Sequence, residues 1–482
     1  MLPFTEQEIL TITGGVPVGV PAEKDGFRSA GSISTDTRTI EAGALFVALV
    51  GERFDGHSFC RTAYEKGASL FLISDEHMLP DEAAGILVPD TLTALHALAR
   101  AYRRKLGCVV IAVTGSVGKT STREMLYTAL SGSRRTHATK QNLNNEIGLP
   151  MTILSAPADT ELLIVEMGMR MSGEIRILTH IAEPDIAIIT NIGVSHIERL
   201  GSHEEILAAK MEICEGLTGR KILLINGDDR HLVESVHSAN PIIWNQLGVT
   251  CIENIDPVRL HPDLTVSASD ISPKNEGTDF SALARFMESE SAIGLGEFLL
   301  PCIGIHHVKN ALFSLACALC LDIDMENVKK GLLSFIPTGS RGRMVQTRLG
   351  LLYDDSYNAS TESMKAAFES IRIIAGHRRK IAALGGMLEL GTFAPEQHFL
   401  VGAAAAAAGF DELYVCGDNR TDVMAGAASV SPELPVHLFE NRDALTAALL
   451  PAIHENDVIL IKGSHSFEME KVTQAIMDTC KN

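Results

Sequence analysis

The sequence lacks an uninterrupted apolar run of the length that a membrane span requires, about 18–20 residues. Its first residues, MLPFTEQEIL, carry Glu6 and Glu8 where a secretory signal would carry basic residues, so we expect no signal peptide. Positive charge is also scarce, because 41 Lys and Arg stand against 60 Asp and Glu. The net charge of −19 argues against nucleic acid or an anionic membrane as a partner.

Paired cysteines are almost absent as well. The nine cysteines are scattered, and one C-x-x-C, formed by Cys317 and Cys320, lies in the apolar run ALFSLACALCL. A spacing of three places both on one face of a buried helix, which favours packing over metal or redox chemistry. Reduced thiols are typical of cytoplasmic enzymes, so we expect this compartment.

What is present is a phosphate-binding pattern at residues 109–122, VVIAVTGSVGKTST. A β-branched strand, a glycine loop and a helix follow one another, so backbone N–H groups and the helix dipole can face an anion. Lys119 can reach the terminal phosphates and Thr120 can hold Mg²⁺. The usual first glycine is replaced by Val113, and a ligand-free glycine turn is the alternative, but such a turn rarely carries Lys and Thr in this register. The predicted nucleotide-binding residues of this loop are Val113, Thr114, Gly115, Ser116, Val117, Gly118, Lys119 and Thr120.

At 482 residues the chain is too long for one ordinary core. Apolar strands alternate with helical stretches in a pattern typical of parallel sheets with crossover helices. Residues 241–300 are more polar, and we expect them to form an antiparallel edge. The predicted units are 1–106, 107–336 and 337–482, with the Pro- and Gly-rich segment 335–344 as the hinge.

Several polar residues follow the strands of the middle unit. Glu166 ends the strand LLIVE, where a carboxylate can bind Mg²⁺, although a solvated strand end is an equal alternative. Asn191, His196 and Lys210 follow the next strand. His196 alone would be a surface or core residue, and Lys210, among apolar neighbours, would ordinarily be a surface lysine.

The sequence resembles the Mur ligases of peptidoglycan synthesis, ATP-dependent amide ligases related to folylpolyglutamate synthase. The resemblance covers nearly the whole chain, through STDTRTIEAGALFVALVGERFDGHSF, TGSVGKTST, NLNNEIGLPMTIL, EMG, SHIE, AAKMEI, GIHHVKNALFSLA and IKGS. It implies an α/β protein of three domains: a small UDP-sugar-binding N-terminal domain, a central P-loop-type ATPase domain with a parallel sheet, and a Rossmann-like C-terminal domain.

Within the family, DDSYNASTESM (354–364) and GGMLELG (385–391) look most like the ligase that joins D-alanyl-D-alanine to UDP-N-acetylmuramoyl-tripeptide. The D-N-P-R motif of the enzymes that add meso-diaminopimelate is absent. The implied reaction passes through an acyl phosphate formed from ATP. The implied partners are these small molecules, and we expect a monomer.

The resemblance also assigns roles to residues. Thr120 and Glu166 would hold one Mg²⁺, and His196 would help to hold a second. Lys210 would react with CO₂ to form a carbamate ligand, so that Lys119, Lys210 and His196 are the predicted catalytic residues. Asn310, Arg343 and Asp355 would contact the nucleotide. The predicted substrate contacts are Asp36, Arg38, Arg53, His57, Asn142, Asn145, Asn358 and Lys462.

Alternatives remain at several positions. Asp36 and Arg38 can pair simply to hold a turn. His307, Ser360, Thr361, Gly386 and His465 depart from the family pattern and leave the dipeptide preference open, as the sequence also leaves the third residue of the substrate peptide. Folylpolyglutamate synthase is an alternative assignment, but it lacks a UDP-binding domain before the loop, which counts against it. A non-catalytic relative would have lost Glu166, His196 or Lys210, and a motor ATPase would carry the full loop with its first glycine.

Overall fold

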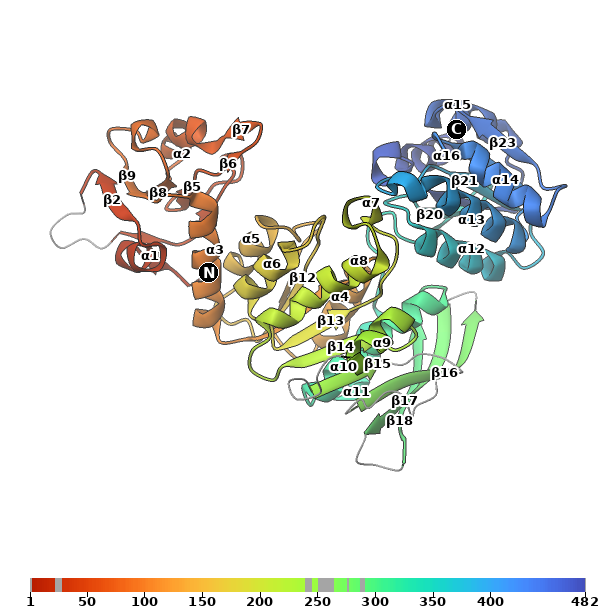
Figure 1. Cartoon of the computed structure of the whole chain (residues 1–482), viewed down its shortest axis with the longest axis horizontal. Helices are drawn as coiled ribbons and strands as arrows, with labels where there is room; N and C mark the ends of the chain where they lie inside the picture. Colours follow the sequence, from red (N-terminus) through yellow and green to blue (C-terminus); the bar gives the residue numbers. More distant parts are fainter. Residues whose placement is uncertain are drawn as a thin grey trace.

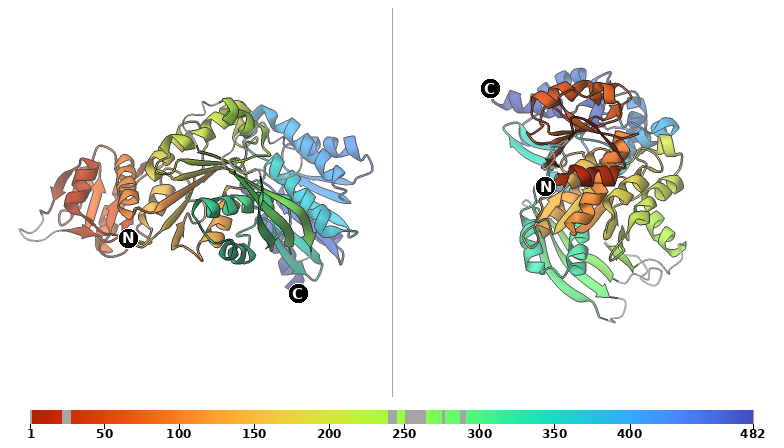
Figure 2. Two further views of the ribbon diagram at one scale, coloured as in Figure 1. Left: turned by 90° about the horizontal axis from the view of Figure 1, so that it is seen from below. Right: turned by 90° about the vertical axis from the view of Figure 1, so that its left-hand side faces the viewer.

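The computed structural model of the chain describes residues 2–21, 28–238, 245–249, 264–274, 277–286 and 291–481. The described strands form three main sheets that follow one another along the sequence (Figure 1). Two views place the first unit (red) and the last (blue) at opposite ends of the middle one (Figures 1 and 2). The predicted fold class, three α/β units, is therefore confirmed.

The N-terminal unit is built on a five-stranded sheet with the order β2-β9-β8-β5-β4, in which β2 is an antiparallel edge and the other neighbours are parallel. Its strands are β2 (Val16–Gly19), β4 (Ile33–Ser34), β5 (Leu45–Val47), β8 (Leu70–Ile73) and β9 (Ala84–Leu87). Short pairs join β1 (Phe4–Thr5) to β3 (Ser29–Ala30) and β6 (Val50–Gly51) to β7 (Phe54–Asp55). The helices are α1 (Glu6–Thr13), α2 (Cys60–Glu65) and α3 (Thr91–Leu106).

Helix α3 leads from this unit into the strand of the phosphate loop. It begins after Asp90, whose side chain accepts a hydrogen bond from the Thr93 N–H (2.6 Å), and it ends at Gly107 with φ 62°. Its basic last turn complements the helix dipole. It packs against α1 on one side and against α5 (Gly148–Leu154) and α6 (Glu174–Ala182) of the middle unit on the other.

The central unit is a nine-stranded sheet with the order β11-β12-β10-β13-β14-β15-β16-β17-β18. Neighbours are parallel as far as β16, and β16, β17 and β18 are antiparallel, so the expected antiparallel edge is present in the described part of 241–300. The strands are β10 (Val109–Thr114), β11 (Thr136–Ala138), β12 (Leu162–Glu166), β13 (Ile186–Ile189), β14 (Ile222–Asn226), β15 (Asn245–Val249), β16 (Leu264–Lys274), β17 (Gly277–Phe286) and β18 (Ile293–Leu300). The remaining helices are α4 (Lys119–Leu130), α7 (Ile197–Leu200), α8 (His203–Met211), α9 (Arg230–Ser238), α10 (Ile305–Cys320) and α11 (Met325–Leu333).

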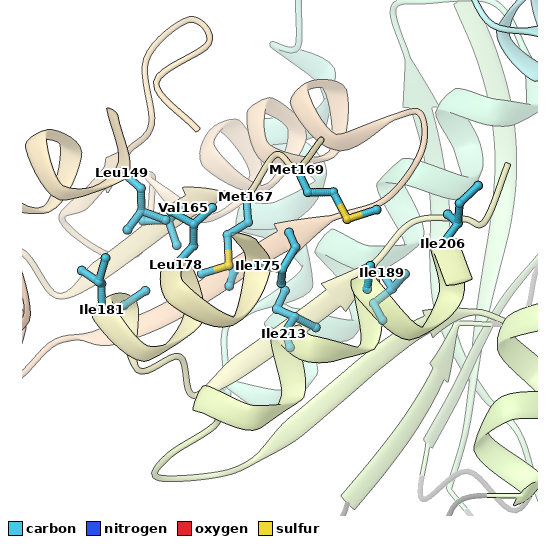
Figure 3. Packing of buried hydrophobic residues seen from close by; sticks show 14 of the residues in the cluster. Leu149, Val165, Met167, Met169, Ile175, Leu178, Ile181, Ile189, Ile206 and Ile213 are labelled. Atoms are coloured by element: carbon cyan, nitrogen blue, oxygen red, sulfur yellow. The ribbon is translucent and has the colours of Figure 1, made fainter. Parts of the chain in front are cut away.

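Strand β10 is apolar on both faces because helices cover both sides of this sheet. Val110 and Ala112 pack into the core under α5 and α6, whereas Ile111 and Val113 pack into the core under α4 and α10. Figure 3 shows the first of these cores, in which residues of α6 lie against the β12 side chain of Val165 and its neighbours. Burial on two faces fixes β10, and with it the loop at its carboxyl end.

The C-terminal unit is a six-stranded sheet with the order β19-β20-β24-β21-β22-β23, parallel except for the edge strand β19. The strands are β19 (Arg343–Thr347), β20 (Gly350–Asp355), β21 (Lys380–Leu384), β22 (Glu412–Cys416), β23 (Val436–Phe439) and β24 (Asp457–Lys462). The helices are α12 (Thr361–Ala375), α13 (Ala394–Ala407), α14 (Arg420–Val430), α15 (Arg442–Leu449) and α16 (Glu470–Lys481). Across the described ranges, no helix combines the length and apolar character needed to cross a membrane.

Candidate active site

The phosphate loop connects β10 to α4, as the sequence predicts. Gly115 has φ 148° and Gly118 has φ 83°, backbone conformations that side chains disfavour. A Cβ on Gly115 would lie 1.9 Å from Oγ1 of Thr190, so the close approach of the next strand also requires glycine. Gly118 immediately precedes α4. The first N–H groups of this helix have no partner within the helix and are available to bind an anion.

The segment after β13 holds this loop in place through hydrogen bonds. Asn191 accepts hydrogen bonds from the Ser116 N–H through its backbone (3.1 Å) and from the Val117 N–H through its side chain (2.9 Å). The Gly193 N–H donates to Oγ of Ser116 (2.8 Å). Asn191 is therefore a positioning residue for the loop.

Lys119 begins α4 and turns back over the loop. Its Nζ donates to the carbonyl oxygens of Gly115 (2.7 Å) and Ser116 (3.3 Å). Burial lowers the pKa of Lys119, and the nearby Glu166 carboxylate partly offsets this effect. A phosphate group entering the loop would offer Lys119 stronger acceptors than these carbonyls.

Glu166 is buried at the carboxyl end of β12, with 2% of its surface exposed. Its Oε1 accepts a hydrogen bond from Nδ2 of Asn144 (2.8 Å). Its Oε2 is buried and has no hydrogen-bond partner among the described residues. Thr120 and Glu166 both line one cavity, so a free carboxylate oxygen and a hydroxyl are available to a hard cation such as Mg²⁺.

The other two predicted metal ligands, Lys210 and His196, do not line this cavity. Lys210, on α8, is only 1% exposed, and no hydrogen bond or ion pair of its ammonium group occurs within the described ranges. Burial lowers the pKa of Lys210 well below its usual value, and the charge of Lys119 adds to this effect. His196 precedes α7 with φ 66°, and its Nδ1 lies 2.6 Å from Oε2 of Glu389 in the C-terminal unit. In the described part of the chain, no three His, Cys, Asp or Glu side chains already form a metal cluster.

The cavity has a volume of about 690 Å³ and lies between the central and C-terminal units. It brings together many residues that the sequence places far apart. The predicted site residues that line it are Ser116, Val117, Gly118, Lys119, Thr120, Asn142, Glu166, Asn310, Asp355, Asn358 and Lys462. The predicted residues that are not part of its wall are Asp36, Arg38, Arg53, His57, Val113, Thr114, Gly115, Asn145, His196, Lys210 and Arg343.

On the C-terminal side, Lys462 and Asp355 are paired across the neighbouring strands β24 and β20. Nζ of Lys462 donates to Oδ2 of Asp355 (2.5 Å) and to the carbonyl of Asn358 (3.0 Å). Burial raises the pKa of Asp355, against the opposing effect of the Lys462 charge. This pair fixes the segment 355–358 at the cavity wall.

Arg341, which the sequence analysis did not select, occupies the place expected for Arg343. Arg343 is exposed on β19, whereas Arg341 lines the cavity and its guanidinium lies 3.9 Å from the centroid of the Tyr357 ring. Both arginines belong to the motif SRGRM, and they differ in which of them the folded backbone directs into the cavity.

Asn144 and Glu362 were also missed. Asn144 orients Glu166, whereas its neighbour Asn145 accepts the N–H of Gly148, the first residue of α5 (2.8 Å). Glu362, in the first turn of α12, reaches across to the central unit, where its Oε1 accepts the Val194 N–H (3.2 Å). A Cβ on Gly193 would lie 2.7 Å from this carboxylate, so a larger residue there would displace the Glu362 side chain.

The positions that depart from the family pattern have local structural roles. Ser360 caps α12, and Thr361 donates to Oε1 of Gln397 (2.7 Å). Gly386 makes room for the Phe467 ring, since a Cβ would lie 2.9 Å from it. The His465 ring lies 5.5 Å from that of Tyr357. His307 is buried, which lowers its pKa to about 4.

In the N-terminal unit, the predicted substrate residues differ in their local contacts and exposure. Asp36 and Arg38 form an exposed ion pair (2.7 Å), and the Arg38 N–H also donates to Asp36, as the turn-holding alternative requires. His57 is buried, its Nδ1 is 2.6 Å from Oδ1 of Asp55, and its Nε2 accepts the Ser74 N–H. These contacts give His57 a structural role and do not support substrate contact. Arg53 is exposed in the β6–β7 turn.

The chain matches known families along most of its length. Residues 30–103 match the family described as "Mur ligase family, catalytic domain", residues 113–318 the "Mur ligase middle domain", and residues 340–465 the "Mur ligase, glutamate ligase domain". The UDP-N-acetylmuramoyl-tripeptide–D-alanyl-D-alanine ligase of Bacillus subtilis (strain 168) is 37% identical over 454 residues, 93% of either chain.

Solved structures show the same similarity. MurF from Acinetobacter baumannii is 28% identical, has a TM-score of 0.85, and covers 99% of this chain and 99% of its own. MurF ligase from Thermotoga maritima, in complex with ADP, is 26% identical with a TM-score of 0.75, covering 93% of this chain and 98% of its own.

Proposed function

The chain belongs to the Mur ligase family, and we propose that it joins D-alanyl-D-alanine to UDP-N-acetylmuramoyl-tripeptide in an ATP-dependent, ADP-forming reaction. One observation carries the proposal: a single cavity is lined both by the phosphate loop of the central unit and by Asp355, Asn358 and Lys462 of the C-terminal unit. A ligase needs this arrangement, because the nucleotide and the two peptides must meet where water is excluded.

The loop would bind the phosphates of ATP, and Lys119 would leave its two carbonyl acceptors to contact them. The carboxylate of the tripeptide then attacks the γ-phosphorus, which gives an acyl phosphate and ADP. The amine of the dipeptide attacks the acyl carbon, phosphate leaves, and an amide remains. Lys119 and the helix N-terminus would offset the charge that develops in the first step.

Thr120 and Glu166 would hold Mg²⁺ beside the phosphates, and this assignment fits the free Oε2 of Glu166. When bound, Mg²⁺ neutralises phosphate charge during phosphoryl transfer. His196 would contribute to a second ion through Nε2, while its Nδ1 stays in contact with the Glu389 carboxylate.

Lys210 would supply a carbamate. Burial lowers the pKa of Lys210 and so favours the neutral amine, which is the form that attacks CO₂. A C–N bond forms, a proton is released, and the product is an anion with two oxygen ligands. Lys210→Ala should therefore be nearly inactive and partly rescued by acetate or formate. Full activity of Lys210→Ala, or its lack of response to either acid, would contradict this role.

The nucleotide half of the site would be completed by Asn310 and Asp355, with Arg341 at the cavity wall in the role predicted for Arg343. The UDP-sugar would contact the N-terminal unit. Exposed Arg53 is the best placed of the predicted residues there, and Asn142 at the cavity would meet the peptide end of the substrate. The extended arrangement of three units suits a long substrate that crosses from one to the next (Figure 1). We further propose that the enzyme acts as a cytoplasmic monomer, without nucleic acid partners and with the unit boundaries 1–106, 107–336 and 337–482.

An isotope experiment tests the reaction. The tripeptide substrate, labelled with ¹⁸O in its terminal carboxylate, is incubated with ATP, Mg²⁺ and D-alanyl-D-alanine. One labelled oxygen should appear in the released phosphate for each amide formed. Unlabelled phosphate accompanied by amide product would contradict the acyl phosphate, and an absence of product would contradict the ligase itself.

A further inference from the structure

Arg123 is a buried arginine beside the nucleotide site, with 4% of its side chain exposed. It lies on α4 one turn after Thr120, so the two residues share one side of the helix. Its Nη1 donates to the carbonyl of Thr139 and to that of Gln141 (3.2 Å), and its Nη2 donates to Oε1 of Glu124 (2.8 Å).

These bonds connect the helix to the segment that orients Glu166. Oγ1 of Thr139 accepts the Glu166 N–H (3.0 Å), and Asn144, a few residues later, holds Oε1 of the same carboxylate. Arg123 therefore sets the position of the Glu166 strand end relative to Thr120. A change here would alter the separation of the two proposed Mg²⁺ ligands.

The distance between Arg123 and Glu166 is informative in itself. Nη1 of Arg123 lies 3.9 Å from Oε2 of Glu166, too far for a hydrogen bond but close enough for strong attraction in a buried environment. The guanidinium thus offsets the cost of burying the carboxylate without occupying its free oxygen. A direct hydrogen bond would instead compete with a cation for that oxygen.

We propose that Arg123 is a positioning residue of the Mg²⁺–nucleotide site, which holds Glu166 in place and compensates its charge while leaving Oε2 available to the ion. The inference rests on the proposed function, in which Thr120 and Glu166 bind Mg²⁺. Groups that support metal ligands in this way typically change metal affinity about 10- to 100-fold when they are removed.

The test is ADP binding to the full-length protein, measured by calorimetry in EDTA and over a series of Mg²⁺ concentrations. In Arg123→Met, the Mg²⁺ concentration that half-maximally strengthens ADP binding should rise about 10- to 100-fold. ADP affinity in EDTA should stay at the wild-type value, because Arg123 does not line the cavity.

Arg103→Met is the matched control. Arg103 is also largely buried and donates to two backbone carbonyls, those of Ala182 (3.0 Å) and Glu183 (2.8 Å), and to the Asp185 carboxylate (3.1 Å), but it lies on α3. Its loss should lower thermal stability without changing either ADP measurement. An equal Mg²⁺ response in Arg123→Met and Arg103→Met would overturn the proposal, as would an equal loss of ADP affinity with and without Mg²⁺.

Arg123→Lys covers the case in which Arg123→Met does not fold. Lysine keeps the charge but cannot donate in the same fork to two carbonyls and a carboxylate, so the half-maximal Mg²⁺ concentration should still rise, by less. An unchanged value would also refute the proposal. If wild-type ADP binding does not respond to Mg²⁺, the proposed metal site is wrong, and that outcome is distinct from a failure of the Arg123 inference.

Discussion

Replacing Lys462 by methionine should weaken the C-terminal sheet, because it leaves Asp355 buried without its cation. Lys462 is 2% exposed, and its Nζ bonds both to Asp355 and to the carbonyl of Asn358. Methionine preserves most of the apolar stem and removes only the charged end. The change therefore isolates the ion pair between β20 and β24.

Removal of one partner from a buried ion pair costs about 3–5 kcal/mol. The Asp355 side chain retains 18% exposure, so we expect the lower part of this range. The cost should also depend on pH. Burial already raises the pKa of Asp355, and loss of the opposing Lys462 charge raises it further. When the pKa of a carboxyl is raised in the folded state, the protein becomes less stable as pH rises from the pKa of the unfolded state, about 3.9, through the pKa of the folded state. The destabilisation should therefore be largest at neutral pH and shrink in mild acid.

Hydrogen exchange of the β20 and β24 amides measures the opening free energy of this sheet directly. Lys462→Met should reduce their protection at neutral pH, and the double variant with Asp355→Asn should recover part of it, because no unpaired charge remains. Unaltered protection in Lys462→Met would refute the reasoning. So would a double variant that loses more stability than the two single variants lose when their losses are added.

Four further variants test other parts of the account. Lys119→Ala should abolish phosphate release while the thermal midpoint stays near the wild-type value, since among the described residues Lys119 donates only to loop carbonyls. A near-normal rate would disprove the loop assignment. Gly115→Ala should abolish ATP binding in calorimetry, because its Cβ would overlap Oγ1 of Thr190, and retained affinity would show that the loop tolerates displacement. Arg53→Ala should raise KM for the UDP-linked substrate and leave KM for ATP unchanged in steady-state kinetics; an unchanged KM for the UDP-linked substrate would remove Arg53 from the substrate site. Asp36→Asn should mainly lower stability, by about 0–1 kcal/mol.

Local patterns predicted the parts of the site that local sequence determines. The strand, glycine loop and helix at 109–122 form as expected, because β-branched residues, positive-φ glycines and a helix start all lie within fourteen residues of chain. Glu166 was placed correctly at a buried strand end for the same reason.

The residues that were missed depend on tertiary contacts. Asn144 and Asn145 are adjacent and chemically identical, yet one orients Glu166 and the other accepts the N–H of Gly148 at the start of α5. Arg341 and Glu362 reach the site only because the C-terminal unit lies against the central one. His57 stands in a turn-like sequence, but Asp55 and Ser74 use both of its ring nitrogens. Such choices follow from the fold and not from spacing.

The central claim is tested most directly by the mass of the product. The purified protein is incubated with ATP, Mg²⁺, UDP-N-acetylmuramoyl-tripeptide and D-alanyl-D-alanine, and the products are identified by mass spectrometry. The account predicts a UDP-linked pentapeptide, equal to the two substrates less one water, with one ADP and one phosphate for each molecule formed. No such product, or an equally fast reaction with a single amino acid in place of the dipeptide, would contradict it.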